Sequence, residues 1–200
     1  MEATLQQSVH PKRGKEVMDQ IGILPVFSHI AFHDGWNSYF SYETCQHVLC
    51  NAHLLRELQG IYEQMKEEWA QEMKGLLQSA KTKKDENNGK VDVLALLRIK
   101  RKYEHILQKG YQLHPTTTEP NPSRGRPKQH PSKNLLNRFA RDRDAILAFL
   151  THEKIPFDNN QAERDIRMEK VKQKVSGSFR SENGVKWFCL TRSLILTALK

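Results

Sequence analysis

The strand-forming residues of this chain are confined to its first quarter, and this restriction limits the folds open to it. Residues 29–34 (HIAFHD) alternate toward β-branched and aromatic types, which predicts a strand, and residues 47–50 (HVLC) predict a second short, buried strand. The longer patterns that follow have helical spacing. We therefore expect an α/β fold, and because two strands alone are marginally stable, we expect the missing first strands to lie before residue 1.

Helices account for most of the remaining sequence. A short helix is expected at 15–24, and a long helical section begins at residue 51. Its apolar face contains Ile61, Met65, Trp69, Met73 and Leu76. Further helices are predicted at 91–109, 133–151, 160–172 and 182–199, with a polar break at 82–90. Residues 114–132 contain five prolines and no apolar cluster, which predicts a loop.

The charge of the chain indicates its class of partner. Its 32 Lys+Arg exceed its 23 Asp+Glu, and the net charge of +9 favours a polyanionic partner, nucleic acid ahead of a membrane. The longest apolar runs are too short to span a bilayer, and residues 1–14 lack the apolar region of a secretory signal. Three cysteines without a framework spacing fit a reducing cytoplasm.

Asp34 is the first candidate for chemistry, because it ends a predicted strand and precedes Gly35. Open α/β sheets place functional groups in the loops at the carboxyl ends of their strands. A carboxylate there can coordinate a hard cation such as magnesium. Asp-Gly is also a common turn sequence, so both interpretations stay open at this stage.

Glu163 is the second candidate, in the stretch FDNNQAER at the start of a basic helix. Asn160 followed by Glu163 matches a variant of the capping box, in which each side chain satisfies a backbone N–H of the first turn. Glu163 also suits the positive end of the helix dipole and can pair with Arg167. Local sequence alone thus gives Glu163 a structural role.

Four collinear blocks carry a resemblance to a known family: ILPVFSHIAFHDGWNSYFSY, HVLCNAHLLREL, LLNRFARDRDAILAFL and IPFDNNQAERDIRMEKVKQKVSGSFRSENG. They resemble the transposases of the insertion sequence sixty-six family over nearly the whole chain from about residue 11. The resemblance implies a ribonuclease-H-like catalytic domain with an Asp-Asp-Glu triad that holds magnesium or manganese. Asp34 corresponds to the second Asp and Glu163 to the Glu.

The same resemblance implies how the chain is divided. The first Asp of the triad is expected upstream of the HPKRG region, so we interpret the chain as a C-terminal fragment with an incomplete ribonuclease-H-like fold. Residues 1–59 are expected to form a partial core with the second Asp. Residues 60–132 form a large α-helical insertion with a Pro-rich basic linker, and residues 133–200 complete the core with Glu163.

DNA contacts are expected from two basic runs. The segment SRGRPK at 123–128 resembles an AT-hook core, whose arginines could lie in a narrow minor groove; a basic linker without a fixed partner is the alternative. The helix that bears Glu163 would face the DNA backbone. The proposed contacts are Arg124, Arg126, Lys128, Arg164, Arg167, Lys170, Lys172 and Lys174.

Other polar residues could line the site. His53 and Arg56 follow the second strand by a turn of helix or less, and Asn159 and Asn160 precede Glu163. A packed histidine, a surface arginine and a solvated turn are the structural alternatives. The spacing Cys50-x-x-His53 also invites a zinc interpretation, but zinc needs four ligands and a strand would direct Cys45 and His47 away from Cys50.

The function implied is metal-dependent cleavage and strand transfer of DNA during transposition of an insertion sequence, by a cytoplasmic, nucleoid-associated bacterial protein. DNA at the element ends and target is the expected partner, with a homo-oligomer in the synaptic complex and no membrane. The fragment alone is expected to be inactive. The alternative is a non-enzymatic DNA-binding module that uses only the basic helices and the AT-hook-like segment.

Overall fold

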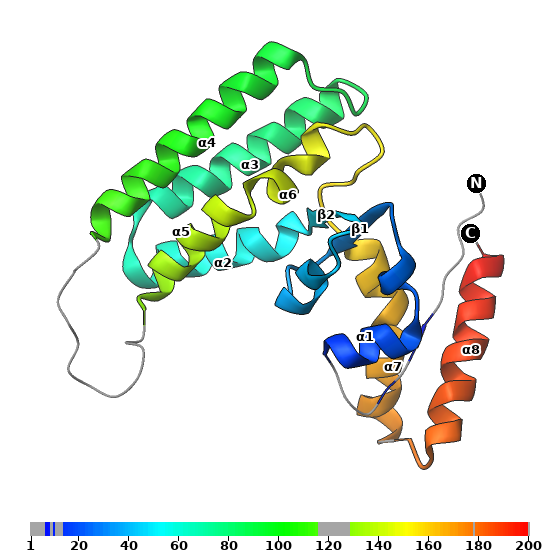
Figure 1. The fold of residues 1–200 in the computed structure, drawn as a ribbon. Coiled ribbons are helices and arrows are strands. Elements are labelled where there is room, and N and C mark those ends of the chain that lie inside the picture. The colour runs from blue at the N-terminus through cyan, green and yellow to red at the C-terminus, as the bar shows by residue number, and fades with distance from the viewer. Residues whose placement is uncertain (1–6, 9, 11–13, 116–128, 178, 200) are drawn as a thin grey trace. The chain divides into compact units, whose positions relative to one another are not determined.

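The computed structural model describes residues 7, 8, 10, 14–115, 129–177 and 179–199 (Figure 1). The chain divides into two compact units. The terminal unit comprises Met1–Ile30, Trp36–Gln46 and Asn159–Lys200, and the helical unit comprises Ala31–Gly35 and His47–Asp158. Each unit is described by itself below.

The sheet consists of β1 (Ile30–His33) and β2 (Gln46–Leu49). The N–H of Gln46 donates to the carbonyl of His29, and the N–H of Cys50 donates to the carbonyl of His33, both at 2.9 Å. This constant offset makes the two strands parallel. Both predicted strands are thus confirmed, and because parallel strands end at the same edge, the residues after His33 and Leu49 share that edge.

The helical unit contains α2 (Asn51–Met65), α3 (Glu68–Glu86), α4 (Val93–Leu113), α5 (Pro131–Arg141), α6 (Arg143–Leu147) and the 3₁₀ helix η3 (Ala148–Leu150). α3 packs against both α2 and α4, and α5 packs against α2 and α4, so four helices enclose one core (Figure 1). Fully buried side chains from the four helices fill it: Leu58, Trp69, Met73, Leu77, Tyr103, Ile106, Leu136 and Phe139.

A chain reversal separates α2 from α3. The helical section predicted from residue 51 breaks at Lys66, which caps α2 in the left-handed conformation with φ 56°. The apolar spacing runs from Ile61 to Met73 without a gap, so periodicity alone could not reveal the break. The short connection makes α2 and α3 neighbours, and each buries its apolar face against the other.

The terminal unit contains α1 (Lys15–Ile21), the 3₁₀ helices η1 (Leu24–Val26) and η2 (Asn37–Ser41), α7 (Asn160–Ser176) and α8 (Glu182–Ala198). Gln7 links the two long helices: its N–H donates to Oγ of Ser193 at 2.9 Å, and its amide donates to the carbonyl of Asp165 at 2.8 Å. The ammonium of Lys172 lies 4.5 Å from the ring centroid of Phe179 and 4.6 Å from that of Phe188.

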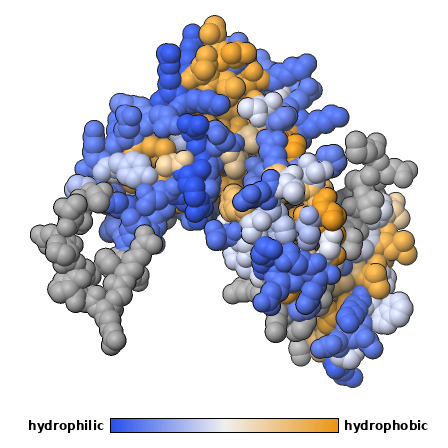
Figure 2. All heavy atoms as spheres, viewed as in Figure 1, coloured by the Kyte–Doolittle hydropathy of each residue, from blue (hydrophilic) through white to orange (hydrophobic). Residues whose placement is uncertain are grey.

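Apolar side chains also reach the surface of each unit. Figure 2 shows apolar residues over the start of α4, where Val93 and Leu94 are exposed, and along α8, where Trp187 and Leu194 are exposed. No helix in the part of the chain that the structure describes has the length and apolar character needed to span a bilayer.

The α/β expectation is confirmed in its coarse form, as a mostly helical chain with a small parallel sheet. The ribonuclease-H-like arrangement stays a prediction, as do the expected domain boundaries at residues 59 and 132.

Candidate active site

Asp34 is exposed and follows directly on β1, at the carboxyl edge of the parallel sheet. Gly35 has φ 88°, a left-handed conformation that favours glycine, so the Asp-Gly pair ends the strand in a tight turn. The turn was expected from the sequence as one of two interpretations of Asp34. The other interpretation, a metal ligand, stays a prediction.

His33 secures this turn from beneath. Its Nδ1 accepts a hydrogen bond from the N–H of Gly35 at 3.1 Å, and its Nε2 lies 3.1 Å from Nδ1 of His47. Burial lowers the pKa of His33 to about 4, and the neighbouring His47 acts in the same direction, against the opposing charges of Asp34 and Asp142. The ring is therefore neutral near pH 7, with its proton on Nε2 because Nδ1 is an acceptor.

The start of α2 lies at the same edge of the sheet. Asn51 is fully buried. Its N–H donates to the carbonyl of Phe157 at 3.2 Å, and its side-chain amide donates to the carbonyl of Ile146 at 3.1 Å. These bonds anchor the first turn of α2. Sequence reasoning missed Asn51, and the available signal was an asparagine placed directly between a buried strand and a helix.

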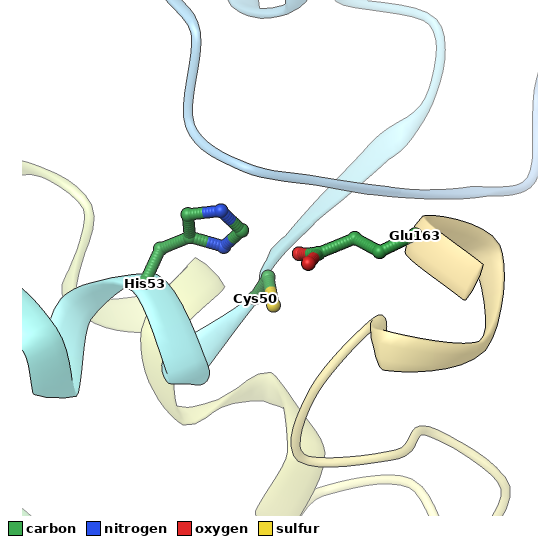
Figure 3. Close-up of side chains that lie close together, drawn as sticks. All are labelled: Cys50, His53 and Glu163. Carbon is green, nitrogen blue, oxygen red and sulfur yellow. The ribbon is translucent and has the colours of Figure 1, made fainter. Parts of the chain in front are cut away.

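Two residues near this anchor, His53 and Arg56, were named as candidates from the sequence, and Cys50 was considered there only for the zinc interpretation that was argued against. Cys50 is buried, His53 is half-buried in the first turn of α2, and Arg56 is exposed one turn farther along. Figure 3 shows Cys50 where β2 meets α2 and the ring of His53 extending from that helix. The arrangement places a half-buried imidazole and an exposed guanidinium on the helix that begins at the edge occupied by Asp34.

Glu163 belongs to the terminal unit, where it is exposed in the first turn of α7 (Figure 3). The expected capping box is not what the described residues form. The N-cap is Asn159 rather than Asn160, and the described part of α7 has no side-chain capping hydrogen bond. The helix starts one residue earlier than a box with Asn160 as the cap requires, so Glu163 takes a later place in the first turn.

The basic residues of α7 differ in their surroundings. Arg164, Arg167, Lys170 and Lys174 are exposed, and Arg164 donates to Oε1 of Gln161 at 3.0 Å. Lys172 is half-buried against its two phenylalanine rings. The AT-hook-like residues Arg124, Arg126 and Lys128 lie outside the described residues.

The candidates thus fall into two groups. Asp34, His53 and Arg56 belong to the helical unit, and Asn159, Asn160 and Glu163 belong to the terminal unit together with the basic residues of α7. In the first group, Asp34 lies at the carboxyl edge of the sheet, and His53 and Arg56 lie on the helix that begins at this edge. A metal site shared by Asp34 and Glu163 remains a prediction.

Comparison with known proteins identifies the family of this chain. Neither curated proteins nor solved structures gave a match to this chain. The profile of the Transposase IS66 family matches residues 4–187, which include both acidic candidates and the basic helix between Asn160 and Ser176. Because the match covers most of the chain and agrees with the four sequence blocks, the chain belongs to the IS66 family of transposases.

Proposed function

We propose that Asp34 and Glu163 are two ligands of a divalent metal site at which the transposase cuts DNA at the element ends and joins it to target DNA. The observation that carries the proposal is the exposure of Asp34 at the carboxyl edge of a parallel sheet, in a chain of a transposase family. Glu163, in the first turn of a basic helix, supplies the second carboxylate.

The donor chemistry of these two residues fits magnesium or manganese. Both offer exposed carboxylate oxygens, the hard ligands that such ions prefer. Bound ions of this kind activate a water molecule and stabilise the leaving oxygen of a phosphodiester. A third carboxylate, the first Asp of the triad that the family resemblance implies, is proposed to complete this site.

In each unit, the residues near the two carboxylates orient them or bind DNA. The neutral ring of His33 holds the turn that presents Asp34 and adds no charge of its own. The exposed guanidinium of Arg56 is suited to a DNA phosphate, and so are Arg164 and Arg167 on α7. DNA binding by these residues should weaken with rising salt, because each neutralised phosphate releases counterions.

The decisive experiment measures strand cleavage of labelled element-end DNA with magnesium, using a chain extended to include the upstream region. Asp34→Asn and Glu163→Gln keep the side-chain shape and remove the charge, so each should abolish cleavage while DNA binding, followed by fluorescence anisotropy, persists. The matched controls are Asp85→Asn, an exposed carboxylate of α3, and Glu182→Gln, the first-turn glutamate of α8. Both controls should cleave like the parent chain.

The rival function, a DNA-binding module without chemistry, predicts a different outcome. If the Asp34→Asn and Glu163→Gln variants cleaved as well as their controls, the metal-site proposal would be wrong. If the parent chain bound element ends but did not cut them under any divalent ion, the binding module would be the better description. The exposed basic residues of α7 are the observation that supports this alternative function.

A further inference from the structure

Three helix ends of the helical unit meet at a cluster that plays no part in the proposed DNA chemistry. Glu67 is the N-cap of α3, His114 is the C-cap of α4 and His130 is the N-cap of α5. One ligand atom from each of the three side chains lies within 4.8 Å of the other two. Residues far apart in the sequence thus offer a carboxylate and two imidazoles to one point.

We infer that Glu67, His114 and His130 form a binding site for a transition-metal dication, with zinc as the best match. Two histidines and one glutamate are a known three-ligand set for zinc, which leaves the fourth tetrahedral position for water. Imidazole favours zinc and its neighbours over magnesium. The site therefore differs in chemistry from the carboxylates Asp34 and Glu163.

The first two ligands are already held in place. Nε1 of Trp69 donates to the Glu67 carboxylate at 2.6 Å, Oγ of Ser132 donates to the same carboxylate, and Nε2 of His114 lies 3.0 Å from it. The side chains of Glu67 and His114 are only 12% and 13% exposed. Burial raises the pKa of Glu67, but these hydrogen bonds outweigh it and lower the pKa overall, so the carboxylate is charged. Ligands fixed in this way lose little freedom on binding an ion.

His130 completes the set from the solvent side. Its ring lies against that of His114, with centroids 4.7 Å apart, and its side chain is exposed. An ion can therefore reach the cluster from solvent. Zinc–ligand bonds of about 2 Å place tetrahedral ligand atoms roughly 3.3 Å apart, so the three side chains need shifts of about an ångström, which the exposed His130 can supply.

Zinc binding requires one change at His114. Its Nε2 donates to the Glu67 carboxylate and therefore carries the ring proton, and this nitrogen becomes a ligand once that proton has moved to Nδ1 of the same ring. The two histidines also flank residues 115–129, so the ion would tie together both ends of the segment that contains SRGRPK. Zinc binding itself does not depend on the proposed DNA function, and only an effect of the ion on DNA contacts of SRGRPK would rest on it.

The test uses the 200-residue chain without a histidine tag, freed of metal by a chelator and titrated with zinc alone against a chromogenic chelator. The parent chain should bind one equivalent. His130→Ala should weaken binding by about tenfold or more, since even a lost partner of a metal ligand costs 10- to 100-fold. His130 makes no side-chain capping bond in the described part of α5, so this variant keeps the contacts of Glu67 with Ser132 and Trp69.

The matched control is His105→Ala, which removes an exposed histidine of α4 far along the helix from His114. It should bind zinc like the parent chain, and only chains with an intact cluster should gain thermal stability from zinc. Cobalt provides a second readout, because a thiolate ligand adds a charge-transfer band. If His130→Ala bound zinc as tightly as the parent, or if cobalt showed a thiolate band that Cys50→Ser removed, the cluster would not be the site. Neither result involves DNA, so it leaves the proposed function untouched.

Discussion

The backbone N–H of Gly35 donates a hydrogen bond to Nδ1 of His33 at 3.1 Å, and this bond closes the turn that contains Asp34. Because Nδ1 accepts, Nε2 carries the ring proton and donates to Nδ1 of His47 at 3.1 Å. A buried, neutral ring inside the sheet thus sets the position of the exposed carboxylate at its edge.

Replacing His33 with phenylalanine keeps a ring of similar size and removes both hydrogen bonds. We expect the free energy of unfolding in urea to fall by about 1–2 kcal/mol, because the part-buried N–H of Gly35 and Nδ1 of His47 each lose a hydrogen bond to the His33 ring. Strand cleavage by the extended transposase should fall as well. His47→Phe is the control, since it leaves the bond between Gly35 and His33 intact. Equal losses of cleavage in the two variants would contradict the positioning role of His33.

At Gly110, α4 lies close to side chains of α3 and α5. A Cβ at this residue would lie 2.5 Å from Cδ2 of Leu136 and 3.1 Å from the ring of Trp69, and both of these side chains are buried. Gly110→Ala should therefore destabilise the chain by about 1–3 kcal/mol, as overpacking does. Gly75→Ala, in open space on α3, should instead stabilise by about 0.5–1 kcal/mol. Urea unfolding of both variants tests this prediction. If the two substitutions changed the free energy of unfolding in the same direction, the prediction would be wrong.

Lys84 ties α3 to the loop that follows η3. Its ammonium donates to the carbonyls of His152 at 3.1 Å and Ile155 at 2.6 Å, and burial lowers its pKa against the opposing charges of Asp85 and Glu153. Lys84→Met should cost about 1–3 kcal/mol of unfolding free energy, because two carbonyls lose their donor. Lys83→Met, at an exposed neighbour, should change little. A Lys84 variant as stable as the Lys83 variant would show that the loop does not need this bond.

Asp19 should make the stability of the terminal unit depend on pH in the acid range. The hydrogen bond from Tyr42 at 2.7 Å lowers the pKa of the Asp19 carboxyl below its ordinary 3.8, and Lys15 adds to the effect. A lowered pKa means that the stabilisation is complete above about pH 4 and is lost as the pH falls through the folded-state value. The difference in urea midpoint between the parent and Asp19→Asn should therefore shrink from pH 6 to pH 3. A difference that stayed constant, or that matched the control Asp85→Asn, would contradict this assignment.

Two kinds of basic residue on α7 should respond differently to mutation. Arg164→Ala and Arg167→Ala remove exposed charges, so each should weaken DNA binding and reduce the slope of log K against log salt by about 1. Lys172 lies over the rings of Phe179 and Phe188. Its alanine variant should leave the salt slope nearly unchanged and lower stability by about 0.5–2 kcal/mol. Anisotropy titrations at several salt concentrations test this prediction. If Lys172→Ala reduced the slope of log K against log salt by about 1, Lys172 would contact DNA instead.

Where the sequence predicted well, the governing interactions are local. Strand and helix periodicity located β1, β2, α4 and α8, and Asp-Gly marked the end of the first strand. The four sequence blocks indicated the family that the profile match confirms. Errors arose where local signals were ambiguous: the apolar spacing of Ile61 and Met73 continues through the reversal at Lys66, and either Asn159 or Asn160 could begin α7.

The sequence by itself determined most of the helices and strands, because periodicity is a property of neighbouring residues, and its four blocks indicated the family. The roles of Asp34 and Glu163 stay predictions from that resemblance. Only the tertiary structure decided that His33 meets His47, that Asn51 anchors α2, and that Glu67 meets His114 and Ser132. These contacts join residues that are distant along the chain or on separate elements. They form only when helices and strands pack against one another. The residue pattern of a single segment therefore does not indicate which residues of another segment it will contact.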